Sequence, residues 1–292
     1  MTSSNIGILS PGDMGQAVAQ RLQARGHAVF TALDDRSPRT QALAARAGIE
    51  DCGSVAHLVA RCDMVWSILN PAAAVDKARE VAAALTRTDR RILYVDCNAI
   101  APETAREIET LITDCGSRFV DAGIIGPPPR GRATARLYVS GSAAGELAGI
   151  VDDQLLVRVL SERAGDASAL KMCYAAITKG AVALGTELFI AARKLGVADA
   201  LEQEFALSMS VVHDWLLTRT PSMPPKAYRW VPEMREIAKT FADAGLTPRL
   251  MEGAADMYEA IAATELGRES PERARERARE PHEVIRALAS EL

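Results

Sequence analysis

The 292-residue sequence has few aromatic residues and no stripe of basic residues. Aromatic residues make up 4% of the chain, and 34 Lys and Arg are scattered among 38 Asp and Glu, for a net charge of −4. A nucleic-acid surface needs clustered basic residues with aromatics between them, so we expect no nucleic-acid partner. The N-terminal MTSSN lacks a basic segment and is followed at once by a strand-like run. We therefore expect no signal peptide and no membrane span, and a cytoplasmic protein.

Cysteine and histidine patterns that would mark a metal site or a disulfide framework are missing as well. No C-x-x-C pair, H-x-x-x-H pair or G-x-S-x-G elbow occurs, which argues against zinc, disulfides and serine hydrolysis. We predict no metal and reduced, structural thiols. The cysteines are Cys52, Cys62, Cys97, Cys115 and Cys173. The histidines are His27, His57, His213 and His282.

Short apolar runs alternate with helical patterns in the first half of the chain, which predicts a doubly wound α/β domain with a mainly parallel sheet. From about Ala167 a long helical pattern leads into a region that is almost entirely helical. We predict an α/β domain over 1–164 and an all-α domain over 165–292, joined by this long helix. The charge-dense segment 267–281 is expected to be a solvated tail or an exposed helix. Expected strands are 6–9, 28–33, 64–69, 92–95, 118–121 and 135–139, and expected helices are 14–25, 37–47, 72–85 and 102–115.

The stretch IGILSPGDMGQAVAQRL has the pattern of a dinucleotide-binding turn, with Ser10 in place of the first glycine. Gly12 would let the backbone approach a diphosphate, and Gly15 would let strand and helix pack closely. Serine can occupy the bend if its φ is negative, and Pro11 fixes the next φ near −65°. The helix that follows would point its N-terminus at the phosphates. The turn predicts as cofactor-binding residues Ser10, Pro11, Gly12, Asp13, Met14 and Gly15.

The end of the second expected strand carries both acidic and basic residues, which bear on the choice of cofactor. Asp34 or Asp35 could accept hydrogen bonds from the adenosine ribose, as in NAD-binding proteins. Arg36 and Ser37, with Arg39 as a further candidate, offer a guanidinium and a hydroxyl to a 2′-phosphate. Because Arg-Ser-Pro follows the strand directly, we predict NADP as the cofactor, with NAD as the alternative.

Several ordered segments resemble the β-hydroxyacid dehydrogenase and 6-phosphogluconate dehydrogenase superfamily. IGILSPGDMG is similar to its IGFIGLGxMG, DMVWSILNPAAAV to its DVVxxxLPxxxAV and VDCNAIAPETARE to its VDxSTISPxTAxx. The resemblance implies a Rossmann domain, a long interdomain helix, a helical domain and a homodimer formed through the helical domains, which complete each other's sites. It also implies that Leu69, Asn70 and Asn98 lie at the cofactor.

Lys171, in KMCYAAITKG, matches the catalytic lysine of that superfamily. Hydride transfer to a carbonyl leaves an alkoxide that needs a proton, and partial desolvation can lower the pKa of a lysine toward the working range. We therefore predict Lys171 as the general acid/base of an alcohol–carbonyl oxidoreductase. Tyr174 and Thr178 follow on the same helical face and are predicted to line the pocket, as is Ala175, where the superfamily has asparagine.

The substrate segment departs from the superfamily pattern. FVDAGIIGPPP stands where the superfamily has FVDAPVSGGxxGA, so Ile125, Gly126 and Pro127 replace Ser-Gly-Gly. This removes a hydroxyl and one backbone N–H, because proline has none. With Trp230 as a further predicted substrate contact, the pocket is expected to be apolar and to take a substrate that is bulkier or less anionic than a small β-hydroxy acid. Ile124 and Pro128 are further candidates.

Two other functions stay open at this stage. Imine reductases belong to the same structural group and carry a similar proline-containing segment, but they usually place Asp, Tyr or Asn at the position of Lys171. A dinucleotide-binding sensor without chemistry is the second alternative, and the altered Ser10 and Ile125 are compatible with it. The presence of Lys171 favours the alcohol–carbonyl oxidoreductase over both.

Overall fold

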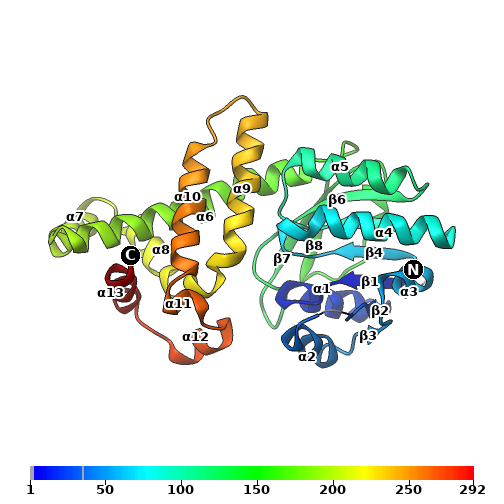
Figure 1. The fold of residues 1–292 in the computed structure, drawn as a ribbon, viewed down its shortest axis with the longest axis horizontal. Helices are drawn as coiled ribbons and strands as arrows, with labels where there is room; N and C mark the ends of the chain where they lie inside the picture. Colours follow the sequence, from blue (N-terminus) through cyan, green and yellow to red (C-terminus); the bar gives the residue numbers. More distant parts are fainter. Residues whose placement is uncertain (1–2, 35) are drawn as a thin grey trace. The chain divides into compact units, whose positions relative to one another are not determined.

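The computed structural model describes residues 3–34 and 36–292 (Figure 1). The chain divides into two compact units, Met1–Met172 and Cys173–Leu292. The division falls inside the long helix α6 (Asp166–Lys194).

The first unit is built on an eight-stranded sheet in the order β3-β2-β1-β4-β5-β6-β7-β8. All neighbouring strands are parallel except β6 and β7. The predicted α/β fold with a mainly parallel sheet is thus confirmed. The strands are β1 (Asn5–Leu9), β2 (Ala28–Thr31), β3 (Glu50–Asp51), β4 (Met64–Ser67), β5 (Leu93–Asp96), β6 (Arg118–Ile125), β7 (Ala135–Ser140) and β8 (Leu155–Ser161).

Helices cover both faces of this sheet, which explains why the central strands are apolar throughout. Successive strand residues point to opposite faces: Ile8 belongs to one buried cluster with Val18 and Ala44, and Leu9 to another with Leu58. The first cluster lies under α1 and α2, and the second under α3, α4 and α5. The helical elements of this unit are α1 (Asp13–Ala24), α2 (Pro38–Arg46), α3 (Val55–Arg61), η1 (Pro71–Ala73), α4 (Ala74–Thr88), α5 (Pro102–Thr113) and η2 (Ala144–Leu147).

The strand order places a topological switch point at β1. β1 pairs with β2 on one side and with β4 on the other. Connections from β1 and β4 therefore leave in opposite directions, and ligands of open α/β sheets bind outside the carboxyl ends of the strands at such a point. We therefore expect a ligand site at the residues that follow β1 and β4.

The second unit is entirely helical over its described residues, as predicted. The charged segment 267–281 contains α12, whose residues are not buried, so it forms the exposed helix that was one of the two expectations. α6 is long and apolar enough to cross a membrane by length and composition, but 44% of its most apolar window is buried and core helices share these properties. The elements are α7 (Ala198–Ser208), α8 (Ser210–Leu217), η3 (Thr220–Ser222), η4 (Pro224–Lys226), α9 (Ala227–Asp243), α10 (Arg249–Ala262), α11 (Glu265–Arg268), α12 (Pro271–Arg277) and α13 (Pro281–Glu291).

Candidate active site

The turn after β1 takes the conformation that a first glycine usually supplies. Ser10 has φ +64°, in the left-handed region, so the expectation of a negative φ is wrong. The Gly12 N–H donates to the Ser10 carbonyl at 2.7 Å, which closes a tight turn around Pro11. Serine adopts this conformation at some cost because its Cβ approaches the following carbonyl. The bend of a dinucleotide-binding turn is therefore kept without its glycine.

The two remaining glycines of this turn have different surroundings. A Cβ on Gly15 would lie 2.8 Å from the Ser10 carbonyl oxygen, so only glycine allows this close approach of helix and turn. A Cβ on Gly12 would have no atom within 4 Å, which leaves open space beside the backbone. Gly12 is also the N-cap of α1 and has no side chain to satisfy the first N–H groups of the helix. Open space beside the backbone and N–H groups that no side chain caps within the described residues fit a diphosphate at this helix N-terminus.

Asp13 and Met14 form the first turn of α1. Met14 packs against the cluster under α1. The Asp13 carboxylate lies 3.0 Å from the guanidinium of Arg130, a residue that sequence reasoning missed.

In dinucleotide-binding α/β folds the residues after the second strand contact the adenosine ribose or its 2′-phosphate, which makes the residues after β2 the candidates here. Asp34 is exposed and Arg36 is half-buried, whereas Asp35 lies outside the described residues. Ser37 is the N-cap of α2, where its Oγ accepts the Thr40 N–H at 3.3 Å. Ser37 therefore has a structural role of its own, and phosphate binding by Arg36 and Ser37 stays a prediction.

Asn98 is buried, and its side chain connects the ends of β4 and β5 by hydrogen bonds. Its Oδ1 accepts the Leu69 N–H at 2.5 Å, and its Nδ2 donates to Ser67 Oγ and to Asp96 Oδ2, both at 2.9 Å. Burial raises the pKa of Asp96 to about 7, opposed by its hydrogen bonds from Asn98. Asn70 is exposed and caps η1 by accepting the Ala72 N–H. Asn98 thus holds the Leu69 backbone in place, and its predicted direct contact with a cofactor is untested.

Lys171 lies on α6 directly against the end of β6. Its Nζ donates to the Ile124 carbonyl at 2.6 Å. Gly123 makes this approach possible, because a Cβ there would lie 3.0 Å from both the Ala167 oxygen and the Lys171 Cβ. The ammonium is therefore held at the carboxyl end of the sheet, on the side where ligands of this fold bind.

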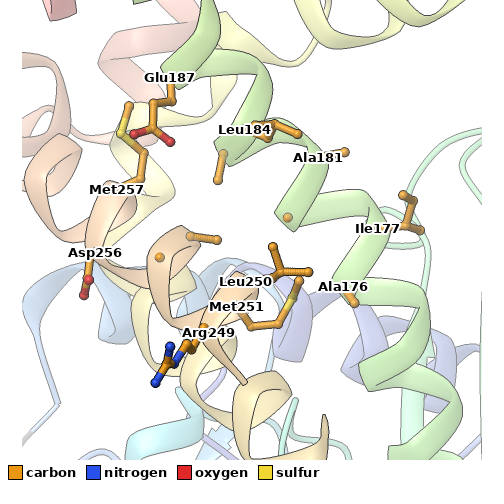
Figure 2. Close-up of a pocket in the computed structure, with 14 residues that line it drawn as sticks. Ala176, Ile177, Ala181, Leu184, Glu187, Arg249, Leu250, Met251, Asp256 and Met257 are labelled. Atoms are coloured by element: carbon orange, nitrogen blue, oxygen red, sulfur yellow. The ribbon is translucent and has the colours of Figure 1, made fainter. Parts of the chain in front are cut away.

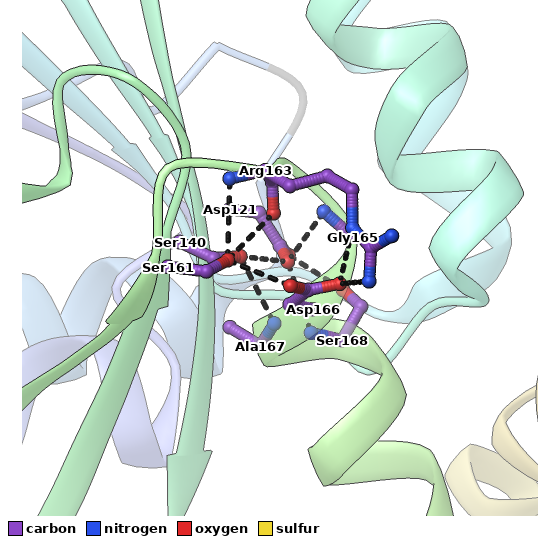
Figure 3. Close-up of polar contacts among 8 residues, drawn as sticks. All are labelled: Asp121, Ser140, Ser161, Arg163, Gly165, Asp166, Ala167 and Ser168. Atoms are coloured by element: carbon purple, nitrogen blue, oxygen red, sulfur yellow. Dashed lines mark hydrogen bonds and ion pairs between the residues drawn. The ribbon is translucent and has the colours of Figure 1, made fainter.

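The start of α6 is fixed by the buried carboxylate of Asp121 on β6 (Figure 3). Its oxygens accept hydrogen bonds from the N–H groups of Gly165 and Ser168, at 2.9 and 3.0 Å. They also accept from the hydroxyls of Ser140 and Ser168, at 2.9 and 2.6 Å. Burial raises the pKa of Asp121, and these hydrogen bonds oppose the rise. Asp121 is thus the N-terminal anchor of the helix that carries Lys171.

The predicted substrate segment continues directly from β6. Ile125 is the last residue of β6 and is buried, while Pro127 is exposed. Gly126 has φ +133°, and a Cβ on it would lie 3.0 Å from the Ala135 Cα, so both conformation and space require glycine. The structure therefore brings Ile125 and the following loop to the same end of β6 as the carbonyl that binds Lys171.

In the second unit Trp230 belongs to a compact polar and aromatic cluster. Its ring packs edge-on against Tyr258, with centroids 5.2 Å apart, and lies 5.6 Å from Lys179 Nζ. Lys179 forms an ion pair with Glu233 at 2.5 Å, and its carbonyl accepts the Tyr258 hydroxyl at 2.6 Å. Burial raises the pKa of Tyr258. These contacts give Trp230 a structural role, and its predicted contact with substrate is untested.

The remaining pocket candidates, Tyr174 and Thr178, lie on α6 beyond Lys171. Tyr174 is 46% exposed, and Thr178 Oγ1 donates to the Tyr174 carbonyl at 3.1 Å. Their role in a pocket shared with Lys171 stays a prediction. Within the described residues, no group of three or more His, Cys, Asp or Glu side chains could hold a metal ion.

Comparison with known proteins gives two family matches. Residues 5–147 match the NAD binding domain of 6-phosphogluconate dehydrogenase, and residues 192–261 match a domain of unknown function. The first unit is therefore an NAD-binding domain, in agreement with the open turn at Gly12.

Three solved structures are similar over most of the chain. A conserved protein of unknown function, itself described as similar to 3-hydroxyacid dehydrogenases, is 31% identical, with 88% of this chain and 96% of that chain covered and a TM-score of 0.64. Mycobacterium tuberculosis 3-hydroxyisobutyrate dehydrogenase is 22% identical, with 95% and 100% covered and a TM-score of 0.70. A Streptomyces aurantiacus imine reductase is 18% identical, with 94% and 100% covered and a TM-score of 0.54, so these last two share the fold. The chain belongs to the β-hydroxyacid dehydrogenase and 6-phosphogluconate dehydrogenase superfamily, of which it is a divergent member.

Proposed function

We propose that the protein is an oxidoreductase that interconverts an alcohol and a carbonyl, with NADP as its preferred cofactor and Lys171 as general acid/base. The observation that carries the proposal is the Lys171 ammonium, bound to the Ile124 carbonyl at the carboxyl end of β6 in an NAD-binding domain. When bound, the cofactor supplies or accepts the hydride.

Lys171 is suited to move the proton that accompanies the hydride. An ammonium has three N–H donors, and the Ile124 carbonyl accepts one of them and so fixes the direction of the side chain. In the reductive direction Lys171 donates a proton to the developing alkoxide oxygen, and in the oxidative direction it removes the hydroxyl proton. Asp121 and Gly123 act as positioning residues, because they set where α6 lies against β6.

Substitution of Lys171 separates this chemistry from binding. We expect Lys171→Ala to lower kcat by about 10²- to 10⁴-fold and to leave the Kd for NADPH nearly unchanged. Lys171→Arg should restore little activity, because a guanidinium keeps its proton at neutral pH. Lys194→Ala, an exposed lysine in the last turn of the same helix, is the matched control and should behave like wild type. Wild-type turnover by Lys171→Ala would remove lysine acid–base catalysis from the proposal.

The preference for NADP rests on Arg36 at the end of β2. Only NADPH has a 2′-phosphate for its guanidinium to bind. Arg36→Ala should therefore weaken NADPH binding at least about tenfold more than NADH binding, which corresponds to about 1.4 kcal/mol. Equal losses of affinity for NADPH and NADH would instead support Asp34 as the residue that accepts hydrogen bonds from the ribose, with NAD as the cofactor.

The substrate proposed is bulkier or less anionic than a small β-hydroxy acid. Ile125 provides no hydroxyl and Pro127 no N–H where the related Ser-Gly-Gly segment would bind a carboxylate. The same replacement favours imine reduction as the second candidate function. A panel of ketones and cyclic imines with NADPH distinguishes them: turnover of imines alone supports the second candidate. Tight NADPH binding without turnover in either direction supports a non-catalytic sensor instead.

We also propose that the helical unit pairs with a second copy of the chain. Ile177 and Leu184 lie seven residues apart on α6 and are each 64% exposed, and Leu250 on α10 is 74% exposed. They border a largely apolar groove of about 630 Å³ between α6 and α10 (Figure 2). Its lining includes Ala176, Gly180, Ala181, Gly253 and Ala254, and such small residues allow close approach of a partner helix.

Sedimentation tests this pairing. We expect a dimer at micromolar concentration, and Leu184→Glu should shift it toward monomer because a charge would be buried in the interface. A fully active wild-type monomer would contradict the shared-site arrangement. A cytoplasmic location and the absence of nucleic-acid and membrane partners stay predictions.

A further inference from the structure

The loop between β6 and β7, residues 126–134, is held against the first turn of α1. Arg130 Nη2 lies 3.0 Å from Asp13 Oδ1 and also donates to the Asp13 carbonyl. The two side chains keep 38% and 32% of their surface exposed, so the ion pair lies at the surface of the unit. An arginine from a loop 117 residues away in the sequence therefore lies beside the turn that fits a diphosphate.

The same loop has a second attachment to α1. Gln154 donates to the Gly131 carbonyl and accepts a hydrogen bond from Arg21, which also pairs with Asp152 at 3.2 Å. This attachment involves the last turn of α1 and does not include Arg130. The loop therefore has a support besides the contacts that the Arg130 guanidinium makes with Asp13.

The negative charge of Asp13 explains why Arg130 would favour the binding of a diphosphate at this turn. A carboxylate in the first turn of a helix is favourable for the helix itself, because it faces the positive end of the dipole. The same carboxylate would repel a diphosphate bound at the Gly12 backbone. Arg130 neutralises this charge, and its planar guanidinium matches phosphate oxygens better than it matches a backbone carbonyl.

We propose that Arg130 is a diphosphate-binding residue of the dinucleotide site, which Asp13 holds beside the turn until the cofactor arrives. The inference rests on the proposed dinucleotide binding but not on the proposed reaction. Because NADH, NADPH and ADP-ribose all contain the diphosphate, Arg130 should contribute equally to the binding of all three. This distinguishes it from Arg36, whose proposed partner occurs only in NADPH.

The experiment measures Kd by calorimetry for NADH, NADPH, ADP-ribose and adenosine 2′-monophosphate, which lacks the diphosphate. We expect Arg130→Ala to weaken the first three about tenfold, or about 1.4 kcal/mol, and to leave adenosine 2′-monophosphate unchanged. The Kd for ADP-ribose should also depend less on ionic strength in this variant, because one charge pair is lost. Arg132→Ala, an exposed arginine of the same loop, is the matched control and should bind like wild type.

Two further variants keep the result interpretable. Arg130→Gln retains a donor for the Asp13 carbonyl and is used if the alanine variant fails to fold, with the same expected losses. Asp13→Asn should tighten ADP-ribose binding several-fold, because it removes the repulsion and releases Arg130. Arg130→Ala or Arg130→Gln that folds and binds ADP-ribose within twofold of wild type would overturn the inference alone. Wild-type protein that binds none of the dinucleotides would overturn the proposed function together with it.

Discussion

Removal of the Asp121 carboxylate should destabilise the first unit more than any other single side-chain change at the site. Asp121→Ala leaves the Gly165 and Ser168 N–H groups buried without their acceptor. Each such orphaned group costs about 1–3 kcal/mol. The hydroxyls of Ser140 and Ser168 can rotate, so we assign to them only a small part of the loss in the free energy of unfolding. The expected loss is about 3–5 kcal/mol, a large part of the 5–15 kcal/mol that stabilises a typical domain.

The isosteric variant tests which property of Asp121 matters. Asp121→Asn removes the charge whose burial raises the carboxyl pKa, but its amide offers only one acceptor oxygen to the donors at the start of α6. We expect a smaller loss of about 2 kcal/mol. Asp153→Ala, an exposed aspartate of the same unit, should change the free energy of unfolding by less than about 0.5 kcal/mol.

Trp66 provides the assay for this unit. Of the three tryptophans, it is fully buried in the sheet, whereas Trp215 and Trp230 lie in the helical unit. In a background with both of the latter changed to phenylalanine, urea unfolding followed by fluorescence reports on the first unit. An Asp121→Ala variant within about 1 kcal/mol of its background would refute the claim that this carboxylate anchors α6.

Three further predictions concern Asp96, Gly123 and Ser10. The folded state raises the pKa of Asp96 from 3.8 to about 7, so it binds that proton more tightly than the unfolded chain. The contribution of Asp96 to the free energy of unfolding should therefore be fully present below about pH 4 and be lost as pH rises to about 7, and the difference in this free energy between wild type and Asp96→Asn should change across that range in urea titrations at several pH values. Gly123→Ala should push α6 away from β6, costing about 1–3 kcal/mol and lowering kcat through Lys171, whereas an unchanged Tm and kcat would contradict the close contact. Ser10→Gly should raise the free energy of unfolding by up to about 1 kcal/mol, because glycine adopts φ +64° without strain, and a destabilised variant would contradict this account.

The fold could be predicted largely from local patterns, because long apolar runs and helical periodicity depend on nearby residues alone. Elements that escaped prediction are those in which such a pattern is short or broken. β3 has only two residues and α3 only seven, too few to show a period. β8 lies at the edge of the sheet and carries exposed residues, among them Val159 at 54%, so its pattern differs from that of the buried strands.

The candidate site was only partly predictable, for a related reason. Gly12 and Gly15 can be recognised because they have the spacing of a dinucleotide-binding turn. Lys171 can be recognised because it lies in a segment that resembles the superfamily. Asp121 and Arg130 act on residues 47 and 117 positions away, so no local pattern indicates their partners. The prediction of a negative φ for Ser10 was wrong, because the general preference of serine for negative φ was given more weight than the bend that this turn requires.

The contacts between β6 and α6 explain how the substrate segment can diverge while Lys171 stays in place. Lys171 binds the backbone carbonyl of Ile124, which every residue type has, so this contact does not depend on the Ile124 side chain, which packs in the buried cluster under α1 and α2. Asp121 and Gly123, which position the helix, precede the substrate segment along the same strand. Changes at Ile125 and Pro127 therefore leave in place the contacts of Asp121 and Gly123 that position α6. The residues of β6 that position α6 therefore come before the residues that differ from Ser-Gly-Gly, so the departure at Ile125 and Pro127 is compatible with the proposed role of Lys171.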